Sequence, residues 1–500
     1  MASDGQPWRL LDVADPDQTA VADLHGTLSW EQVEARGRRL ARGLDDRGLA
    51  GASWAVLSGN RAEWAEWALA SARSGSMLVP LNWHLGPEEL AELLADSESR
   101  LLVCEPDLAD TARKAAGLAG GVAVLVVGED YETFRDSHGD EPLTERPAGG
   151  PMFYTGGTTG RSKGVVRTDG GGTSEGWVEQ WGGWARLVRM PDTGRTLATT
   201  PLYHALGFAV FAASLTSGVP VTIHTRFEPE ATLAAIAQER ITSAAMVPTQ
   251  FIRLLKLPDD LRRRHDVSSL RWILHTAAPC PEWAKRAMIE WWGPVIHEMY
   301  GSSEGAGPAV CDSHEWLAHP GTVGKATAAI EYSIIGEDGQ DLPPGEVGTI
   351  YARRVGGPPE YRGDPDKTAA ARLPDGRFTV GDLGWLDEEG YLYLADRRVD
   401  LIISGGTNVY PAEIEAVLIR HPAVADAAVF GIPHPEWGQE IKAVLEPSPG
   451  VSIDLDDVVE FAAAHLAKFK RPASYDVVEQ LPREAHGKLK KRLLRDPYWQ

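Results

Sequence analysis

The chain has 500 residues, more than one ordinary hydrophobic core holds, so two or more structural units are expected. Hydrophobic residues make up 43% and charged residues 24%, which is typical of a globular protein and excludes a disordered chain. The net charge of −22 repels nucleic-acid phosphates and anionic lipids, so neither nucleic acid nor a membrane is expected as a partner.

The cysteines and the N-terminal residues indicate the compartment. Cys104, Cys280 and Cys311 are too few and too widely spaced for a disulfide framework or a zinc site. Residues 1–18 contain four aspartates and no apolar core, unlike a secretory signal peptide. We therefore expect a cytoplasmic protein. As a separate expectation, the protein is a monomer or a homodimer.

The first part of the chain alternates strand-like and helix-like segments. Residues 53–57 predict a buried strand, and residues 61–72 predict a helix with Asn60 as its cap. Further short strands are predicted at residues 101–104 and 122–127. This alternation predicts a layered α/β fold.

One uncharged segment, residues 202–225, approaches the length of a membrane span. Pro220 and two glycines interrupt it, so a buried helix followed by a strand is the better interpretation.

The pattern changes after Gly345. Residues 383–394 predict a hairpin that turns at residues 387–390. A compact α+β unit follows, in which Pro411 starts a helix and Pro422 ends it. The later elements are strands at residues 424–430 and 442–445 and a helix at residues 457–467. We place the domain boundary near residues 396–400, which gives a large N-terminal domain (residues 1–396) and a small C-terminal domain (residues 397–500).

The segment after a strand-like Met152–Tyr154 carries the strongest chemical signal. Glycines let backbone N–H groups approach a polyphosphate, threonine hydroxyls donate to its oxygens, and lysine adds positive charge. The order Lys-Gly differs from that of a P-loop. By composition alone, a flexible surface loop fits equally well. The residues are Thr155, Gly156, Gly157, Thr158, Thr159, Gly160, Arg161, Ser162, Lys163 and Gly164.

This loop resembles the phosphate loop of the adenylate-forming superfamily, which includes acyl-CoA synthetases, luciferases and peptide-synthetase adenylation domains. The likeness to acyl-CoA synthetases is the strongest. Further segments resemble the family's motifs in the family's order, from residue 27 to the end. They are Pro201-Leu202-Tyr203-His204, Thr276-Ala277-Ala278-Pro279, Tyr300-Gly301-Ser302-Ser303-Glu304, Val380-Gly381-Asp382, Asp396-Arg397, Ser404-Gly405-Gly406-Thr407-Asn408-Val409-Tyr410-Pro411 and Leu481-Pro482-Arg483 with Gly487-Lys488.

The resemblance implies a large N-terminal domain of several subdomains, built from layered sheets and helices, and a small mobile C-terminal domain. It also implies the enzyme's activity: ATP and a carboxylic acid form an acyl-AMP, after which the small domain rotates and coenzyme A receives the acyl group. The implied nucleotide-binding residues are Thr155, Gly156, Gly157, Thr158, Thr159, Gly160, Lys163, Thr276, Ala277, Ala278, Pro279, Tyr300, Gly301, Ser302, Ser303, Asp382 and Arg397.

The implied catalytic residues are Lys488, His204 and Glu304. Lys488 would bridge the carboxylate and the α-phosphate and offset the developing charge. Glu304 would hold Mg²⁺, a cation that prefers carboxylate and phosphate oxygens. His204 would line the acid pocket, and Gly405 and Gly406 would face the incoming thiol.

Each role has a simpler alternative. A lone histidine in an apolar segment such as His204 is often a packed residue, and Glu304 is equally compatible with a solvated acid. Asp382 and Arg397 also fit a structural ion pair. The basic segment around Lys488 fits a solvated face.

The acid and the acceptor are less determined. Trp177, Trp181 and Trp184 have helical spacing, which by itself predicts core packing. In the family that this chain resembles, a helix after the phosphate loop often borders the acyl pocket. The resemblance therefore implies, as an alternative, a pocket for a bulky or aromatic acid, with room left by the small residues Ala306 and Gly307.

Coenzyme A is the expected acceptor, because Gly405 and Gly406 are present and residues 468–472 are basic. An amine is the alternative, because Val399 departs from the Asp or Lys that the family usually has at the hinge. A third reading is an α/β-hydrolase, from the Gly-x-Ser-x-Gly match at residues 301–305. It leaves the phosphate loop unexplained.

Overall fold

The structure is a computed structural model. It describes residues 11, 13, 15–141, 143–155, 163–165, 172–302, 307–354, 368, 369, 371–397, 400–404, 407–483 and 488–499.

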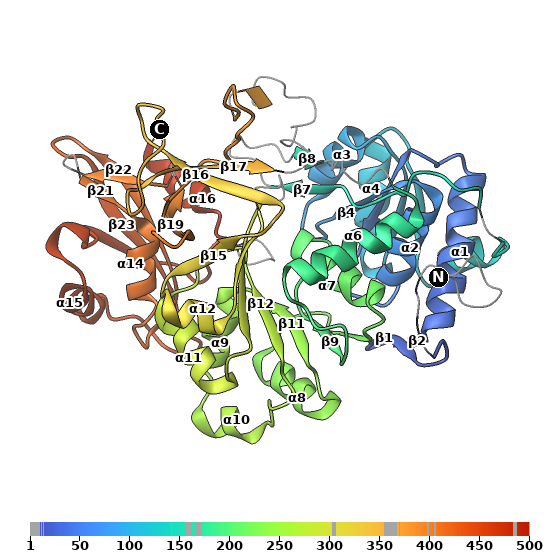
Figure 1. Cartoon of the computed structure of the whole chain (residues 1–500), viewed down its shortest axis with the longest axis horizontal. Helices are drawn as coiled ribbons and strands as arrows, with labels where there is room; N and C mark the ends of the chain where they lie inside the picture. Colours follow the sequence, from blue (N-terminus) through green and yellow to red (C-terminus); the bar gives the residue numbers. More distant parts are fainter. Residues whose placement is uncertain are drawn as a thin grey trace.

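The largest sheet in the described part of the chain has 13 strands and runs through the middle of the molecule (Figure 1). Its order is β16-β17-β18-β19-β15-β14-β13-β12-β11-β9-β10-β1-β2. The strands are β1 (Thr19–Asp23), β2 (Gly26–Ser29), β9 (Thr196–Ala198), β10 (Val221–Ile223), β11 (Ser243–Met246), β12 (Trp272–His275), β13 (Ile296–Tyr300), β14 (Ala309–Cys311), β15 (Thr322–Ala326), β16 (Ile330–Ile335), β17 (Gly348–Arg354), β18 (Asp382–Leu386) and β19 (Tyr391–Arg397).

Strands β10, β9, β11, β12 and β13 form a parallel block within this sheet. These strands are short and mostly buried, as expected of parallel strands covered by helices. The helices between and around them are α6 (Ser174–Leu187), α7 (Ala205–Thr216), α8 (Pro229–Glu239), α9 (Pro248–Leu255), α10 (Asp259–Arg264) and α11 (Glu282–Trp292).

The predicted buried helix and strand in residues 202–225 are confirmed as α7 and β10. Helix α7 is apolar on all sides and lies in the core, which explains its membrane-like composition. No helix in the described part of the chain is long and apolar enough to cross a membrane.

A second, parallel sheet has the order β4-β3-β5-β6. It confirms the strands predicted at residues 53–57, 101–104 and 122–127. Its strands and helices are β3 (Ser53–Leu57), β4 (Met77–Leu81), β5 (Ser99–Cys104), β6 (Ala123–Val126), α1 (Trp30–Asp46), α2 (Trp64–Ser74), α3 (Pro87–Asp96), η1 (Pro106–Leu108), α4 (Ala109–Leu118) and α5 (Tyr131–Asp136).

The helix predicted at residues 61–72 is present as α2, but the prediction that Asn60 caps it is wrong. Helix α2 begins at Trp64 after Glu63, and no side chain caps its first turn. The Asn60 side chain bonds instead to backbone groups more than a hundred residues away. Asn60 therefore bonds to backbone groups of distant segments and does not cap the helix that follows it in the sequence.

The antiparallel end of the large sheet contains the hairpin predicted after Gly345. Strands β18 and β19 pair in antiparallel register, and the N–H of Gly390 donates to the carbonyl of Asp387 at the turn. Helix α12 (Ser313–Ala318) lies between β14 and β15 in the chain.

The C-terminal elements form a five-stranded sheet, in the order β21-β20-β23-β22 with β24 beside β23. Figure 1 shows it on the side of the molecule opposite to α1. The predicted helix is confirmed as α14, which begins at Pro411 and ends before Pro422. The elements are β20 (Ile402–Ser404), β21 (Thr407–Val409), α14 (Pro411–Leu418), β22 (Val424–His434), β23 (Gly438–Pro447), α15 (Leu455–His465), η3 (Lys468–Lys470), β24 (Ser474–Val477), α16 (Lys491–Arg495) and η4 (Asp496–Trp499).

The C-terminal unit packs against α9 and α11 of the large unit. Ile252 of α9 and Ala284 of α11 share one apolar cluster with Leu418 of α14. The indole N–H of Trp283 donates to the carbonyl of Ala416 at 3.3 Å. The domain boundary near residues 396–400 stays a prediction.

Candidate functional site

Three of the predicted motif segments lie at carboxyl ends of strands in the parallel block. Residues 201–204 follow β9, residues 276–279 follow β12, and residues 300–302 end or follow β13. Open α/β sheets bind ligands beyond the carboxyl ends of their parallel strands. The topology therefore gathers these segments at one edge of the sheet, which is where a nucleotide is expected.

The predicted phosphate loop joins two paired strands, β7 (Phe153–Thr155) and β8 (Lys163–Val165). Thr155 and Lys163 face each other in the antiparallel register, so the loop leaves and returns at the same point. The loop residues Gly156, Gly157, Thr158, Thr159 and Gly160 lie outside the described residues. For Thr155 and Lys163 only the backbone pairing is described, so their predicted contacts with phosphate stay predictions.

The segment after β12 has an unusual backbone. Ala277 has a φ of +76°, in the left-handed region that a residue with a Cβ seldom adopts. Thr276 beside it is buried, and Ala277 and Pro279 are exposed. Such strain persists only where the surroundings impose it, and it is common at ligand-binding turns. The turn after β12 thus has a constrained backbone at Ala277, within the predicted segment of Thr276, Ala277, Ala278 and Pro279.

The end of β13 is tied to the start of β18 by one polar contact. The hydroxyl of Tyr300 donates to Oδ2 of Asp382 at 2.7 Å, and both side chains are buried. A Cβ on Gly307 would lie 2.6 Å from Cα of Gly301, so the chain returns tightly past Tyr300 and needs glycine there. Gly301 and Ser302 are placed by this turn, whereas Ser303, Glu304 and Ala306 lie outside the described residues.

Asp382 and Arg397 are direct partners in the β18–β19 register. The side chain of Arg397 is not described, so its predicted contact with a ribose stays a prediction. Gly405 and Gly406 lie outside the described residues. The residues on either side of them, Ser404 and Thr407, are paired across the β20–β21 hairpin.

His204 lies at the N-terminus of α7 and is half-buried. Its ring centroid is 4.4 Å from that of Tyr203. Its backbone N–H donates to the carbonyl of Pro201 at 3.1 Å, and its own carbonyl accepts from Phe208. The side chain of His204 does not cap the helix.

Lys488 lies in the C-terminal unit and is half-buried. The short segment that carries it is closed by a β-bridge between Arg483 and Leu489 and by a 2.7 Å bond from Lys490 N–H to the carbonyl of Pro482. Arg483 forms an ion pair with Asp426 on β22. Lys488 thus lies beside Leu489, whose bridge to Arg483 brings it close to β22 at the edge of the C-terminal sheet.

A buried charged network beneath the strand ends was missed by sequence reasoning. Lys285 is fully buried, and its Nζ lies 2.5 Å from Oε2 of Glu298 on β13. Nε2 of His275, the last residue of β12, lies 3.4 Å from the same oxygen. Burial, with Lys285 nearby, keeps the pKa of His275 well below its usual value, so this ring is neutral. The available signal was the helical spacing of Lys285 with Met288 and Trp292, both core residues.

The three tryptophans do lie on one helix, α6, but two of them are core residues. Trp177 and Trp181 pack edge to face, and Trp181 also meets Phe208 of α7. Trp184 is half-buried and lies between two apolar clusters. Among the three, only Trp184 is exposed enough to fit the prediction of a pocket wall.

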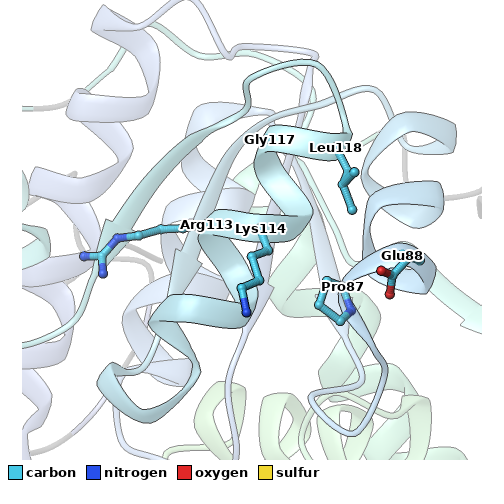
Figure 2. A pocket seen from close by; sticks show the side chains of 6 residues that line it. All are labelled: Pro87, Glu88, Arg113, Lys114, Gly117 and Leu118. Carbon is cyan, nitrogen blue, oxygen red and sulfur yellow. The ribbon is translucent and has the colours of Figure 1, made fainter.

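A surface hollow of about 490 Å³ lies between α3 and α4 (Figure 2). Its wall includes Leu118, which is 62% exposed. None of the predicted site residues lines this hollow. Its lining residues are Pro87, Glu88, Arg113, Lys114, Gly117 and Leu118.

Comparison with known proteins identifies the family. A family model described as AMP-binding enzyme matches residues 12–361, and a second, described as AMP-binding enzyme C-terminal domain, matches residues 413–488. The chain belongs to the AMP-binding enzyme family. It is therefore an AMP-forming carboxylic acid–CoA ligase or a related acyl-adenylate-forming ligase, which decides against the hydrolase alternative.

Three similar proteins span nearly the whole AMP-binding enzyme. A feruloyl-CoA synthase from Amycolatopsis sp is 35% identical over 486 residues, which is 95% of each chain. An indoleacetate–CoA ligase from Aromatoleum aromaticum is 33% identical, over 95% of this chain and 94% of its own. The solved amide bond synthetase McbA from Marinactinospora thermotolerans superposes with a TM-score of 0.82 at 26% identity, over 98% of both chains.

Proposed function

We propose that this enzyme uses ATP to activate a bulky hydrophobic or aromatic carboxylic acid as acyl-AMP and then transfers the acyl group to coenzyme A. The supporting observation is a set of partly exposed apolar side chains around one buried cluster: Trp184, Leu206, Met299 and Val310. Leu206 lies two residues after His204, and Met299 directly precedes Tyr300. Apolar surface thus adjoins the segments proposed to hold the nucleotide.

The names of two of the relatives support the same class of acid. Feruloyl-CoA and indoleacetate–CoA ligases are named for aromatic acids. A pocket lined by aromatic and aliphatic side chains with few polar groups suits such a ligand.

The nucleotide is proposed to span the strand ends. The hairpin from Thr155 to Lys163 would hold the phosphates, residues 276–279 the adenine, and Asp382 with Arg397 the ribose. Glu304, a carboxylate, is the hard oxygen ligand that Mg²⁺ prefers, and the ion would reduce the charge of the polyphosphate.

In the first step the acid's carboxylate oxygen attacks the α-phosphorus of ATP, and pyrophosphate leaves with the electron pair of the broken bond. Lys488, from the C-terminal unit, would contact both the carboxylate and the α-phosphate and offset the charge that develops between them. In the second step a thiolate attacks the acyl carbonyl and AMP leaves.

The second step would involve rotation of the C-terminal unit, because Lys488 and the paired residues Ser404 and Thr407 lie in different segments of that unit. The polar contacts that now hold it include the bond from Trp283 to Ala416 and one from Nζ of Lys256 to the carbonyl of Val424. Each such bond contributes about 0.5–1.5 kcal/mol, so the contacts are reversible. On η3, Lys470 is already paired with Glu413 at 2.6 Å, which leaves less free charge for CoA phosphates than its sequence suggests.

An amine acceptor is the second candidate. The likeness to McbA, a protein named as an amide bond synthetase, favours it, as does Val399, which lies outside the described residues. An amide synthetase on this fold would need the first step and an amine in place of the thiol.

The decisive experiment is acid-dependent ATP–pyrophosphate exchange across benzoates, cinnamates, heteroaryl acids and fatty acids. The best acid is then incubated with ATP and either CoA or a panel of amines, and the product is identified by mass. We expect aromatic acids to lead and an acyl-CoA to form. A clear preference for long-chain fatty acids would contradict the proposed acid, and an amide as sole product would contradict the acceptor.

Trp184→Ala tests the pocket directly. It should change the ranking of the acids, whereas Trp291→Ala, a half-buried indole beside Arg262 on another face, should leave the ranking unchanged.

A further inference from the structure

The side chain of Asn60, in the segment after β3, joins three backbone groups of distant segments. Its Nδ2 donates to the carbonyl of Thr200 at 3.0 Å and to that of His224 at 3.1 Å. Its Oδ1 accepts from the N–H of Leu202 at 2.8 Å. Asn60 is 5% exposed, so these bonds face little competition from water.

Only an amide side chain matches this set of partners. Two carbonyls need two donors and one N–H needs an acceptor, and asparagine supplies both on a short, stiff side chain. Aspartate would keep the acceptor but place a charged oxygen against two carbonyls. The three contacts therefore require the two donors and the acceptor of asparagine, and a polar side chain of another type would not make all of them.

The bonds fix the turn that carries His204. Thr200 and Leu202 flank Pro201, whose carbonyl accepts from the N–H of His204. On the other side of the turn, a Cβ on Gly207 would lie 2.2 Å from the carbonyl oxygen of Pro201. The turn thus lies between Asn60 and the first turn of α7, and it packs closely against both.

The third bond extends this hold to the neighbouring strand. His224 follows β10, and its own N–H donates to the carbonyl of Ala198 on β9 at 3.0 Å. Asn60 therefore fastens the ends of two adjacent strands of the large sheet to the end of β3 in the second sheet.

We propose that Asn60 is a positioning residue for adenylation. It holds the turn of residues 200–204 so that Tyr203 and His204 keep their place beside the acid, without touching a substrate itself. This inference rests on the proposed role of His204 in the acid pocket. A purely structural Asn60 would stabilise the packing of the two sheets and have no specific effect on the acid.

The test is a double-mutant cycle between Asn60→Asp and His204→Ala, measured by acid-dependent pyrophosphate exchange on the full chain. A small displacement of a positioning group can reduce rate about 100-fold. We expect Asn60→Asp to lower kcat/KM for the acid by roughly 10- to 100-fold, with little change in KM for ATP. In the His204→Ala background the same substitution should have a much smaller effect, because coupled residues are not additive.

Ser269→Ala is the matched control for stability. Ser269 is buried, and its hydroxyl donates to the carbonyl of Ile241 at 2.7 Å. It lies just before the start of β12, whereas the candidate site lies beyond the end of that strand. This variant should lower the unfolding midpoint while leaving kcat/KM for the acid unchanged. If Asn60→Asp does not fold, Asn60→Ser enters the same cycle, since serine is smaller and uncharged.

The outcomes separate the inference from its premise. A normal kcat/KM in His204→Ala would overturn both the role of His204 and the inference about Asn60. A strong effect of His204→Ala combined with equal effects of the Asn60 substitution in both backgrounds would overturn only the inference, and would make Asn60 a structural residue.

Discussion

The phenol of Tyr300 and the carboxylate of Asp382 meet at 2.7 Å, although three strands of the large sheet lie between the strands that carry them. Tyr300 ends β13 in the parallel block, and Asp382 begins β18 in the antiparallel end. Both side chains are buried, so the bond is shielded from water. It joins two segments whose proposed ligand is the same nucleotide.

Tyr300→Phe should weaken nucleotide binding. Loss of this bond would release the Asp382 side chain that is proposed to hold the ribose. A ribose hydrogen bond to a charged group is worth about 1.5–3 kcal/mol, so we expect KM for ATP to rise roughly 10-fold or more, with KM for the acid little changed. Steady-state pyrophosphate exchange at varied ATP measures this. Tyr332→Phe is the control, because Tyr332 lies in the same apolar cluster and its hydroxyl has no hydrogen-bond partner among the described residues. An unchanged KM for ATP in Tyr300→Phe would remove the Tyr300–Asp382 pair from the nucleotide site.

Lys488→Ala should abolish acyl-adenylate formation without unfolding the chain. The lost ammonium group would otherwise offset charge in the transition state, and removal of one such group costs about 100- to 1,000-fold in rate. Pyrophosphate release reports the loss, and far-ultraviolet circular dichroism checks the fold. The exposed Lys490, two residues away, gives the control Lys490→Ala. Pyrophosphate release by Lys488→Ala close to that of the unmodified enzyme would refute the assignment.

Lys285→Met should destabilise the large unit strongly. It leaves the buried carboxylate of Glu298 without its cation, a situation that costs about 3–5 kcal/mol in folding free energy. Denaturation by urea measures the loss. The double variant Lys285→Met/Glu298→Gln should recover much of it, because no unpaired charge then remains. Equal stability of the single and double variants would show that leaving the Glu298 carboxylate without a cation does not destabilise the fold.

His297 on β13 should make the enzyme less stable in mild acid. Burial lowers the pKa of His297 to about 4, whereas a histidine in an unfolded chain titrates near ~6.5. The unfolded state therefore binds the proton first, and stability that is full above pH ~6.5 is lost as the pH falls toward 4. Nearby Asp312 and Glu315 oppose this shift and Arg189 adds to it.

The loss attributable to His297 is about 2 kcal/mol by pH 5, measured by urea denaturation at pH 5 and pH 7.5. His297→Gln should reduce the difference between the two pH values by that amount. His314→Gln, at an exposed position on α12, should not change it. The buried His275, whose pKa is also lowered, should leave part of the acid sensitivity in place.

Local chemistry along the chain was enough to determine much of this protein. Short apolar segments bounded by turn residues predicted β3, β5 and β6, and the apolar residues 202–225 predicted α7 and β10. The hairpin at residues 387–390 and the helix starting at Pro411 followed from turn and proline geometry. The order of the motif segments was sufficient to indicate the adenylate-forming family, because each motif is a continuous stretch of sequence.

Only the tertiary structure decided which side chains meet across the fold. Asn60 has the right chemistry for a helix cap, but three backbone groups from other strands bind it instead. Lysine is usually a surface residue, yet Lys285 is buried and forms an ion pair with the carboxylate of Glu298 on β13. Tyr300 and Asp382 are 82 positions apart in the chain. Sequence spacing dictates which residues share a helix face or a strand edge, whereas such long-range partners depend on how the sheets are ordered in space.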